Sequence, residues 1–301
     1  MKKVTFNRFG GTDVLQLTEA PMPEGEILVQ VKAVSINPLD WKLWQGEMKM
    51  MGGRKFPKSV GIDFSGIVER SSGKFRKGDE VFGIASLFKG GALAEYVAVK
   101  ATDITHKPAA ISFEEAASLP VAGSAALQIF DKLVKIQPGM QVLINGAGGG
   151  IGPVAIQLAK KAGAIITAVV GAAAVDLVST LGSDVVINYQ QENVLASGKA
   201  FDAVIDLSGK ITYKQAQTIL KKKGIYVNTS PGFKEIIGSL FSGGRNKPLL
   251  LKPSPAYLEE LASAGLRVVV SRRYNFNDYI KAYDEVKKGG VAGKAVFVIN
   301  S

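Results

Sequence analysis

The chain has 301 residues, of which 47% are hydrophobic and 21% charged, and its formal net charge at pH 7 is +11. This length accommodates two domains of ordinary size, and the composition is typical of a globular protein. Cysteine is absent, which excludes disulfides, thiolate metal ligands and cysteine nucleophiles. The basic residues form short, scattered clusters without interleaved aromatic side chains, so nucleic acid is not expected as the main ligand.

The sequence also lacks the features of an exported or membrane-inserted protein. Its first residues are basic but are not followed by the apolar core of a signal peptide. The longest weakly polar run, 162–175, is too short to span a bilayer. Together with the absence of cysteine, this pattern predicts a cytoplasmic protein without membrane insertion.

The first part of the chain, to about Lys107, consists of strand-like runs cut by glycine and proline. Such runs predict a mainly antiparallel β unit. The runs cover 27–34, 66–69, 80–83 and 93–99.

From about Phe113 helices and strands alternate, which predicts a parallel, doubly wound sheet. A helix over 113–133, broken near Pro120 and Gly123, comes first. Strands are expected at 142–146, 165–170, 184–188, 202–207, 225–229 and 249–252, with helices such as 175–181 and 213–222. In the tail, a helix at 257–264 precedes strands at 267–271 and 294–299 that flank a helix at 277–288, and periodicity alone does not assign this tail to either unit.

The most informative segment runs from Gln141 to Gly163 and places a strand, a glycine turn and a helix start in succession. Five glycines fall within the seven residues from Gly146 to Gly152. The spacing Ala147-x-Gly149-x-x-Gly152 fits the three-point dinucleotide fingerprint, and Pro153 follows at a position where a helix tolerates a missing N–H. Free N–H groups at this helix start are expected to face a pyrophosphate. The alternative is a turn that only packs a helix on a strand.

The strand that follows the turn bears on the type of nicotinamide cofactor. NAD-specific sites usually end this strand with Asp or Glu, which binds the adenosine ribose. Here the strand ends at Gly171, so no carboxylate repels a 2'-phosphate and NADPH is favoured. The next residues are Ala172-Ala173-Ala174, which provide no positive group to bind that phosphate.

Seven motifs along nearly the whole chain resemble the zinc-independent quinone oxidoreductase branch of the medium-chain dehydrogenase/reductase superfamily. They are Asn37-Pro38-Leu39-Asp40-Trp41-Lys42, Gly61-Ile62-Asp63-Phe64-Ser65-Gly66, Gly90 to Val97, Ala116 to Leu127, the glycine turn, Asp184 to Tyr189, and Gly293-Lys294. The resemblance is greatest to plant-type quinone oxidoreductases and enone reductases. It implies an α/β protein with a GroES-like, β-rich substrate domain (1–121 and 266–301) and a Rossmann dinucleotide-binding domain (122–265).

The sequence argues against a zinc site. A catalytic zinc needs three protein ligands and an open position, and the chain contains one histidine, His106, and no cysteine. In zinc-dependent relatives a cysteine ligand falls at the position of Asn37 and a histidine ligand at that of Ile62. We therefore expect no metal, and we interpret His106 as a surface residue.

The resemblance implies one catalytic residue and a set of cofactor contacts. Related enone reductases carry a lysine in the setting of Lys42, where an ammonium group can stabilise a developing oxyanion or donate a proton. The alternative is a surface lysine paired with Asp40. The expected cofactor-binding residues are Asn37, Lys42, Ser124, Ala147, Gly149, Gly150, Ile151, Gly152, Gly171, Ala172, Tyr189, Leu207, Ser208, Thr229 and Ser230. Ala125 departs from the family, in which threonine is common at this position.

These features predict a metal-free, NADPH-dependent reductase that transfers hydride to quinones or α,β-unsaturated carbonyl compounds. Two alternatives remain open at this point: an enoyl-thioester reductase, and a catalytically weak NADPH-binding protein with a sensing or structural role. The resemblance also implies a homodimer that acts on a small-molecule quinone or enone.

Overall fold

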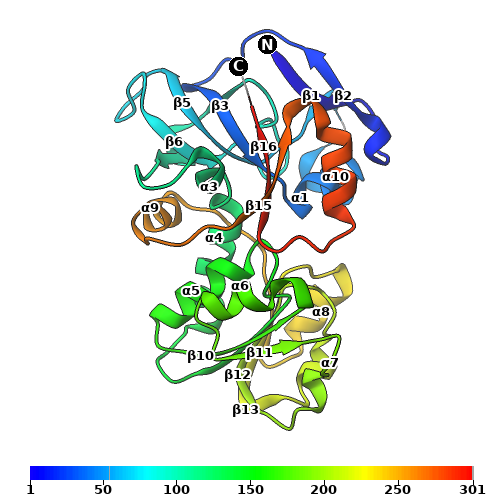
Figure 1. Cartoon of the computed structure of the whole chain (residues 1–301). Coiled ribbons are helices and arrows are strands. Elements are labelled where there is room, and N and C mark those ends of the chain that lie inside the picture. The colour runs from blue at the N-terminus through cyan, green and yellow to red at the C-terminus, as the bar shows by residue number, and fades with distance from the viewer. Residues whose placement is uncertain (54, 300–301) are drawn as a thin grey trace. The chain divides into compact units, whose positions relative to one another are not determined.

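The computed structural model describes residues 1–53 and 55–299, and it divides into two compact units (Figure 1). Unit 1 comprises Met1–Val121 and Pro253–Ser301, and unit 2 comprises Ala122–Lys252. The chain thus returns to unit 1 at Pro253, earlier than the predicted boundary between 265 and 266. The reason is helix α9 (Pro255–Ser263), which packs against strand β8 (Ile104–His106) and pairs Glu259 with Lys74 at 2.9 Å.

Unit 1 is β-rich, as the glycine-cut strand pattern predicts. A seven-stranded sheet has the order β15-β16-β3-β5-β6-β8, with β7 paired to β3, and a three-stranded sheet has the order β2-β1-β4. All pairs are antiparallel except β15 with β16. The tail therefore extends the sheet of unit 1, because β16 (Lys294–Val298) pairs with β3 (Ile27–Ser35).

The remaining elements of unit 1 are short. Its other strands are β1 (Lys2–Phe6), β2 (Leu15–Glu19), β4 (Lys58–Ser59), β5 (Asp63–Arg70), β6 (Glu80–Ile84), β7 (Tyr96–Val99) and β15 (Val270–Asn275). Its other helices are α1 (Pro38–Trp44), α2 (Lys49–Gly52), α3 (Phe113–Ala117) and α10 (Tyr279–Lys287).

Aromatic contacts pack the two helices α1 and α10 onto the sheet of unit 1. The Trp44 ring meets Tyr283 edge to face with centroids 4.7 Å apart, and Tyr283 meets Phe297 at 5.4 Å. All three side chains are almost fully buried. Trp44 is thus a core residue that fixes the C-terminal end of α1.

Unit 2 contains a six-stranded sheet of order β11-β10-β9-β12-β13-β14 in which every pair is parallel. The order reverses at β9, which is typical of a doubly wound dinucleotide-binding domain. The strands are β9 (Gln141–Asn145), β10 (Ile165–Val170), β11 (Val185–Asn188), β12 (Phe201–Asp206), β13 (Leu220–Asn228) and β14 (Asn246–Pro248). The predicted fold class, a β-rich unit with a parallel-sheet unit, is confirmed.

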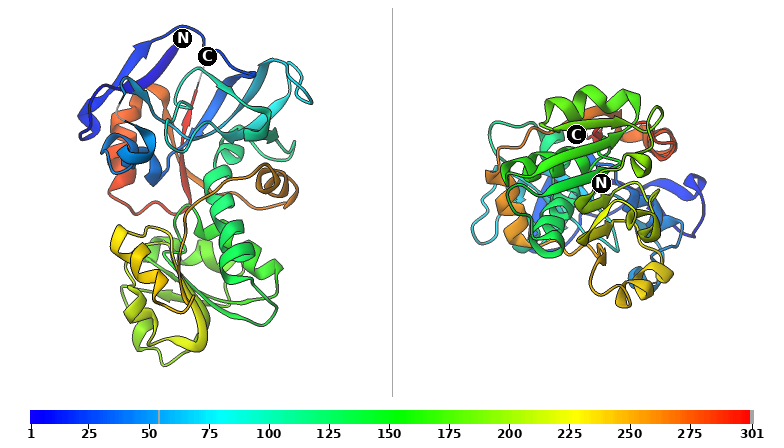
Figure 2. Two further views of the ribbon diagram at one scale, coloured as in Figure 1. Left: turned by 180° about the vertical axis from the view of Figure 1, so that it is seen from behind. Right: turned by 90° about the horizontal axis from the view of Figure 1, so that it is seen from below.

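Helices cover both faces of this parallel sheet. They are α4 (Pro120–Gln128), α5 (Gly152–Lys161), α6 (Val175–Thr180), α7 (Tyr213–Ala216) and α8 (Phe233–Leu240). In Figure 1, α5 and α6 lie in front of the sheet, whereas α4 (green) and α8 (yellow) come to the front in the view from behind in Figure 2. The central strands β9 and β12 are buried on both faces, which explains their continuous apolar sequences.

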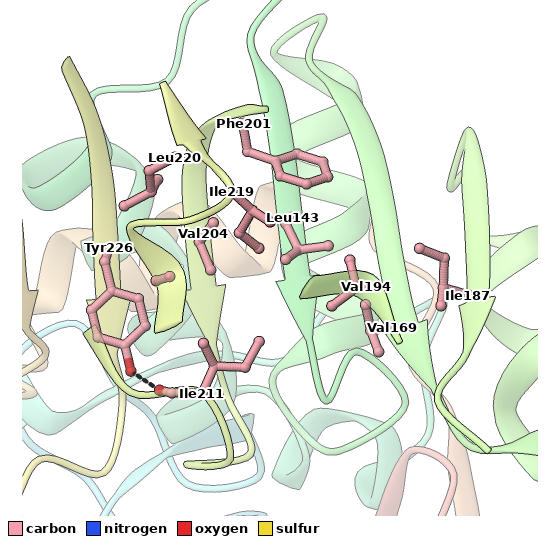
Figure 3. Close-up of a cluster of buried hydrophobic side chains, with 11 residues drawn as sticks. Leu143, Val169, Ile187, Val194, Phe201, Val204, Ile211, Ile219, Leu220 and Tyr226 are labelled. Atoms are coloured by element: carbon pink, nitrogen blue, oxygen red, sulfur yellow. Dashed lines mark hydrogen bonds between the residues drawn. The ribbon is translucent and has the colours of Figure 1, made fainter. Parts of the chain in front are cut away.

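A buried cluster of eleven hydrophobic side chains forms a core on one face of this sheet (Figure 3). Leu143 and Val204 contribute from the two central strands, and Phe201 and Tyr226 are its largest members. The Tyr226 hydroxyl donates a hydrogen bond to the Ile211 carbonyl oxygen, so this buried polar group is satisfied.

Three expected elements differ from the structure. The helix expected at 213–222 ends at Ala216, and β13 begins at Leu220, because Leu220 pairs with Phe201 of β12. The strand expected at 249–252 lies at β14 instead. The helical segment from Phe113 is interrupted directly before Pro120 and continues through Gly123. Pro120 begins a new helix because proline suits a first helical turn.

No helix in the described ranges has the length and apolar character needed to cross a bilayer.

Candidate functional site

The glycine turn connects β9 to α5 with a geometry that requires glycine at two points. Gly146 has a φ of +77°, in the left-handed region that L side chains rarely adopt. A Cβ on Gly152 would lie 1.9 Å from the Ala147 carbonyl oxygen, so this glycine lets the start of α5 pack closely on the beginning of the turn. A Cβ on Gly149 would instead meet only the Gly146 oxygen, at 3.6 Å. The turn is therefore tight at its two ends and has free space beside Gly149.

The start of α5 suits an anion. Its N-cap residue is Ile151, which has no side-chain oxygen, and Pro153 occupies the first turn. The first N–H groups of a helix have no partners within the helix, and together with the helix dipole they attract negative charge. A pyrophosphate beside Gly149 and Gly150 would satisfy these N–H groups. The donor set thus fits a dinucleotide.

The end of β10 lies next to the end of β11. Tyr189 follows β11, and its hydroxyl lies 3.0 Å from the position that a Cβ on Gly171 would take. The Ala172 N–H donates to the Gln190 side-chain oxygen at 3.3 Å. Gly171, Ala172 and Tyr189, predicted as contacts for the adenosine end, are therefore neighbours in unit 2.

A depression of about 460 Å³ adjoins these residues. It is lined by Ala172, Val175, Asp176, Val186, Asn188, Gln191 and Glu192. Two of the lining side chains are carboxylates and none is cationic. The depression therefore offers no positive charge to a 2'-phosphate. Asp176 and Glu192 also bring carboxylates near the end of β10, where the sequence predicts none that would repel this phosphate.

Two further predicted pairs follow the neighbouring strands of the same sheet. Leu207 and Ser208 directly follow β12, and Thr229 and Ser230 directly follow β13. Because all these strands are parallel, the residues after them lie at one edge of the sheet together with the glycine turn. The structure thus brings together every predicted cofactor-binding residue that follows a strand of unit 2.

Ser124 lies in α4 and is completely buried. Within residues 1–53 and 55–299, its hydroxyl oxygen has no hydrogen-bond partner. An unsatisfied buried hydroxyl is costly, so this group stands out among the buried polar groups of unit 2. Its neighbour Ala125 is equally buried and has no polar group to contribute.

In unit 1, the helix α1 carries Lys42, whose side chain is half-buried. Lys42 forms no ion pair within the described part of the chain. Asp40 is fully buried, and its Oδ2 accepts the Asn37 N–H at 2.8 Å as part of a capping box. The alternative reading, in which Lys42 pairs with Asp40, is therefore wrong.

Asn37 is only 2% exposed, and its amide is occupied within unit 1. Its Oδ1 accepts from Lys294 Nζ at 2.7 Å, and its Nδ2 donates to Asp63 Oδ2 at 3.0 Å. Asp63 also accepts the Val121 N–H at 3.1 Å. The structure thus leaves the Asn37 amide no free hydrogen-bonding group for a cofactor, in contrast to Lys42.

Burial raises the pKa of Asp40 and of Asp63 to about 7, and burial lowers the pKa of Lys294 from its ordinary value. The Lys294 ammonium acts in the opposite direction and lowers the pKa of both carboxyls, and the Tyr283 hydroxyl lowers that of Asp40. Neither Tyr283 Oη nor Asp40 Oδ1 makes a hydrogen bond of standard geometry within the described ranges. The cluster is a buried charge network at the N-terminus of α1.

His106 is half-exposed and has a local partner. Its Nε2 lies 3.0 Å from Asp79 Oδ2, and its ring packs against Phe75 with centroids 4.9 Å apart. This is the surface environment predicted for the single histidine. Among the described residues, no group of three or more histidine, cysteine, aspartate or glutamate side chains has the arrangement of a metal site.

Known proteins match both units. Residues 23–109 match the family described as alcohol dehydrogenase GroES-like domain, and residues 150–288 match the family described as zinc-binding dehydrogenase. The chain is 32% identical to the chloroplastic quinone-oxidoreductase QR1 of Triphysaria versicolor, over 98% of each chain.

Two further comparisons extend the likeness. The chain is 30% identical to the chloroplastic NADPH-dependent alkenal/one oxidoreductase of Arabidopsis thaliana, over 98% of this chain and 79% of that one. The solved structure of the quinone oxidoreductase from Coxiella burnetii superposes with a TM-score of 0.90 at 32% identity, over 100% of this chain and 99% of that one. The chain belongs to the quinone oxidoreductase branch of the medium-chain dehydrogenase/reductase superfamily.

Membership of this branch gives a context for Asn37 and Ile62, the two positions at which we expect the ligands of zinc-dependent members of the superfamily. Ile62 is fully buried and apolar. Asn37 is held between Lys294 and Asp63. In this quinone oxidoreductase-like chain, an internal polar network therefore occupies the position of the cysteine ligand.

Two sets of residues were missed by the sequence analysis. Asp63 and Lys294 stand within quoted motifs, yet no role was assigned to them. Their signal was a charged residue directly beside an apolar run, at the start of a strand. Asn145 and Asp206 carried a related signal, since each is a polar residue at the end of an apolar strand.

Proposed function

We propose that this protein is a metal-free reductase that uses NADPH to reduce quinones or α,β-unsaturated carbonyl compounds. The observation that carries the proposal is the likeness to QR1 at 32% identity over 98% of both chains, since it covers both units. The enone class is supported by the relative named an NADPH-dependent alkenal/one oxidoreductase. The free space beside Gly149 and the uncapped start of α5 support the dinucleotide.

The proposed cofactor contacts are the predicted ones without Asn37, whose amide is already bound to Lys294 and Asp63. The N–H groups from Gly150 to Gly152 hold the pyrophosphate, and Ser124 provides its unpaired hydroxyl. Gly171, Ala172 and Tyr189 hold the adenosine end. When bound, NADPH supplies the hydride for the acceptor.

Lys42 is the proposed catalytic residue. As hydride reaches a quinone or the β carbon of an enone, negative charge develops on the acceptor oxygen. The Lys42 ammonium, which has no competing ion pair in the described ranges, stabilises that oxygen or donates a proton to it.

The test measures NADPH oxidation with a panel of quinones, short enones and enoyl thioesters. We expect turnover with the first two classes. Preference for enoyl thioesters would identify the alternative reductase, and NADPH binding without turnover on any acceptor would identify a sensing or structural protein.

The role of Lys42 is tested in the same assay with saturating NADPH. The Lys42→Ala variant is expected to lower kcat by a factor of about 100 or more, the usual contribution of general acid–base or oxyanion groups. Lys281→Ala, which removes an exposed lysine from α10, is the matched control. Equal turnover of the two variants would remove Lys42 from the site.

Homodimerisation and a cytoplasmic location complete the proposal. Leu240 and Phe241 are 79% and 85% exposed at the end of α8, which supports a surface covered by another subunit. Light scattering coupled to size-exclusion chromatography tests the dimer, and a monomeric mass would contradict it. The location needs its own test, because two relatives are named chloroplastic. Fractionation of cells that produce the protein provides it.

A further inference from the structure

Asp206, the last residue of β12, is fully buried at the edge of the sheet where the cofactor-binding segments meet. Its Oδ1 accepts hydrogen bonds from Asn145 Nδ2 (2.9 Å), Ser208 N (3.1 Å), Ser208 Oγ (2.8 Å) and Gly209 N (3.1 Å). Its Oδ2 accepts the Ile211 N–H at 2.9 Å. One carboxyl group thus organises the whole turn that follows β12.

The same residue reaches the strands on both sides of β12. Asn145 is the last residue of β9, directly before the glycine turn, and its carbonyl oxygen accepts the Leu207 N–H at 2.9 Å. The backbone oxygen of Asp206 accepts both the N–H and the hydroxyl of Thr229 at 3.2 Å. Three cofactor-binding segments, after β9, β12 and β13, are therefore joined at Asp206.

The hydroxyl of Ser208 is fully used in this network. It donates to Asp206 and accepts from Asn145 Nδ2 at 2.8 Å and from Lys210 N at 3.2 Å. Ser208 also stands against the glycine turn, since a Cβ on Gly146 would lie 3.0 Å from the Ser208 Cβ. The hydrogen bonds of Asp206 therefore control how closely the loop approaches the turn.

The far end of the loop is anchored in the hydrophobic core. Ile211 donates its N–H to Asp206, and its carbonyl oxygen accepts from the Tyr226 hydroxyl (Figure 3). The loop from Leu207 to Ile211 is thus held at both ends by buried groups, and Asp206 and Asn145 together connect it to the glycine turn.

We propose that Asp206 is the positioning residue of the dinucleotide site, holding the glycine turn, the loop 207–211 and Thr229 in the arrangement that binds the cofactor. The inference rests on the proposed function, because it assumes that a nicotinamide dinucleotide binds at this edge of the sheet. Asp206 acts through these segments and does not itself touch the cofactor.

The variant Asp206→Asn tests the proposal with a minimal change of shape. Asparagine has one acceptor oxygen and one NH2 group. In one orientation the amide oxygen replaces Oδ1, and the NH2 group then faces the Ile211 N–H. In the flipped orientation the amide oxygen replaces Oδ2, and the donors that Oδ1 accepted lose their acceptor. Either way a buried donor loses its partner.

A matched control lies on the same strand. Asp202, near the opposite end of β12, accepts the Gln141 N–H at 2.8 Å and the Lys221 ammonium at 2.7 Å. Asp202→Asn therefore also removes a carboxylate that ties β12 to β9, but at the end of the sheet away from the glycine turn. Urea unfolding of both variants separates the effect on binding from that on stability, since Asp202 is 28% exposed and Asp206 is fully buried.

The Kd of NADPH is measured by isothermal titration calorimetry, and stability by urea unfolding. We expect Asp206→Asn to raise the Kd by about 10-fold or more, with kcat at saturating NADPH largely retained, and Asp202→Asn to leave the Kd unchanged. The milder variant Asn145→Ala, which removes one link to the glycine turn, should raise the Kd in the same direction if Asp206→Asn does not fold.

The outcomes separate the two proposals. Absence of NADPH binding to the unmodified protein would overturn the proposed function itself. If the unmodified protein binds NADPH, two results would overturn the positioning role alone. One is an unchanged Kd in both Asp206→Asn and Asn145→Ala. The other is an equal increase of the Kd in these two variants and in Asp202→Asn.

Discussion

The Lys294 ammonium donates a 2.7 Å hydrogen bond to Asn37 Oδ1, and so joins the first residue of β16 to the N-cap of α1. The same amide donates a hydrogen bond through Nδ2 to Asp63, the first residue of β5. A positive charge, a neutral amide and a carboxyl group are therefore arranged in a row inside unit 1. Because α1 carries Lys42, the orientation of the proposed catalytic residue depends on this row.

Replacement of Lys294 by methionine is expected to destabilise the protein. The variant keeps the length of the side chain but leaves Asp40 and Asp63 buried without their compensating cation. It also leaves two buried acceptors, Asn37 Oδ1 and the Ile36 carbonyl oxygen, without the ammonium that donates to them, and an unsatisfied buried polar group typically costs about 1–3 kcal/mol. Urea unfolding at pH 7 measures the change, with the exposed Lys287→Met as control. Equal stability of the two variants would show that the ammonium does not compensate the carboxyls.

The contrast between this network and the glycine turn shows what the sequence predicts well. Strand β9, the turn and α5 are contiguous, so local periodicity and the spacing from Ala147 to Gly152 were sufficient to predict them. Asp63 and Lys294 lie far apart in the chain, and their connection through Asn37 depends on the pairing of β16 with β3. No local pattern in a single sequence reports such a pairing.

Contacts between distant segments also account for the misplaced elements. The segment from Tyr213 to Lys222 has apolar residues at helical spacing, but Leu220 begins a strand that pairs with β12, and Ile219 and Leu220 are both buried in the core. Similarly, α9 belongs to unit 1 because of its contact with β8. Tertiary contacts decide both cases, and they are not encoded in the local periodicity.

The buried carboxyls predict a fall in stability with rising pH. The pKa of Asp40 and of Asp63 is raised from 3.8 to about 7 by burial. Between about pH 4 and pH 7 the folded protein therefore holds protons that the unfolded chain has released, so the free energy of unfolding decreases as the pH rises. The decrease is up to about 4 kcal/mol for each carboxyl.

Chemical denaturation at a series of pH values from about 4.5 to 7.5 measures this effect. Carboxyls with a lowered pKa, such as Asp184, lose their contribution only below their ordinary value of 3.8, outside this window. The Asp40→Asn variant should show a shallower pH dependence than the unmodified protein, because one of the two carboxyls is gone. Asp13→Asn, at an exposed position, is the control. Parallel curves for the unmodified protein and Asp40→Asn would contradict the prediction.

A pair of glycine variants separates cofactor binding from folding. Gly152→Ala places a methyl group 1.9 Å from the Ala147 oxygen, so we expect a loss of stability of about 1–3 kcal/mol from overpacking.

Gly149→Ala meets no described atom outside its immediate neighbours closer than 3.6 Å, so the fold is expected to be unaffected. Its methyl group occupies the space where the backbone approaches the pyrophosphate, and the Kd of NADPH should rise at least about 10-fold. Calorimetric titration and urea unfolding of both variants test the distinction, and unchanged NADPH binding by a stable Gly149→Ala protein would remove the turn from the site.

The depression beside Ala172 predicts how cofactor choice can be changed. Its lining includes Asp176 and Glu192 and no cation, so a 2'-phosphate at the end of β10 experiences repulsion that the free ribose of NADH does not. Asp176→Asn is expected to lower the Kd of NADPH by about 2-fold to 5-fold, a change typical of one exposed charge interaction, and to leave the Kd of NADH unchanged.

Ala173→Arg should strengthen NADPH binding further, because a guanidinium binds phosphate in a bidentate manner. Both effects must weaken in high salt, since the groups are solvent-exposed. If instead NADPH and NADH respond equally to these substitutions at every salt concentration, the 2'-phosphate does not lie at this edge of the sheet, and the adenosine end of the cofactor must be held by other residues.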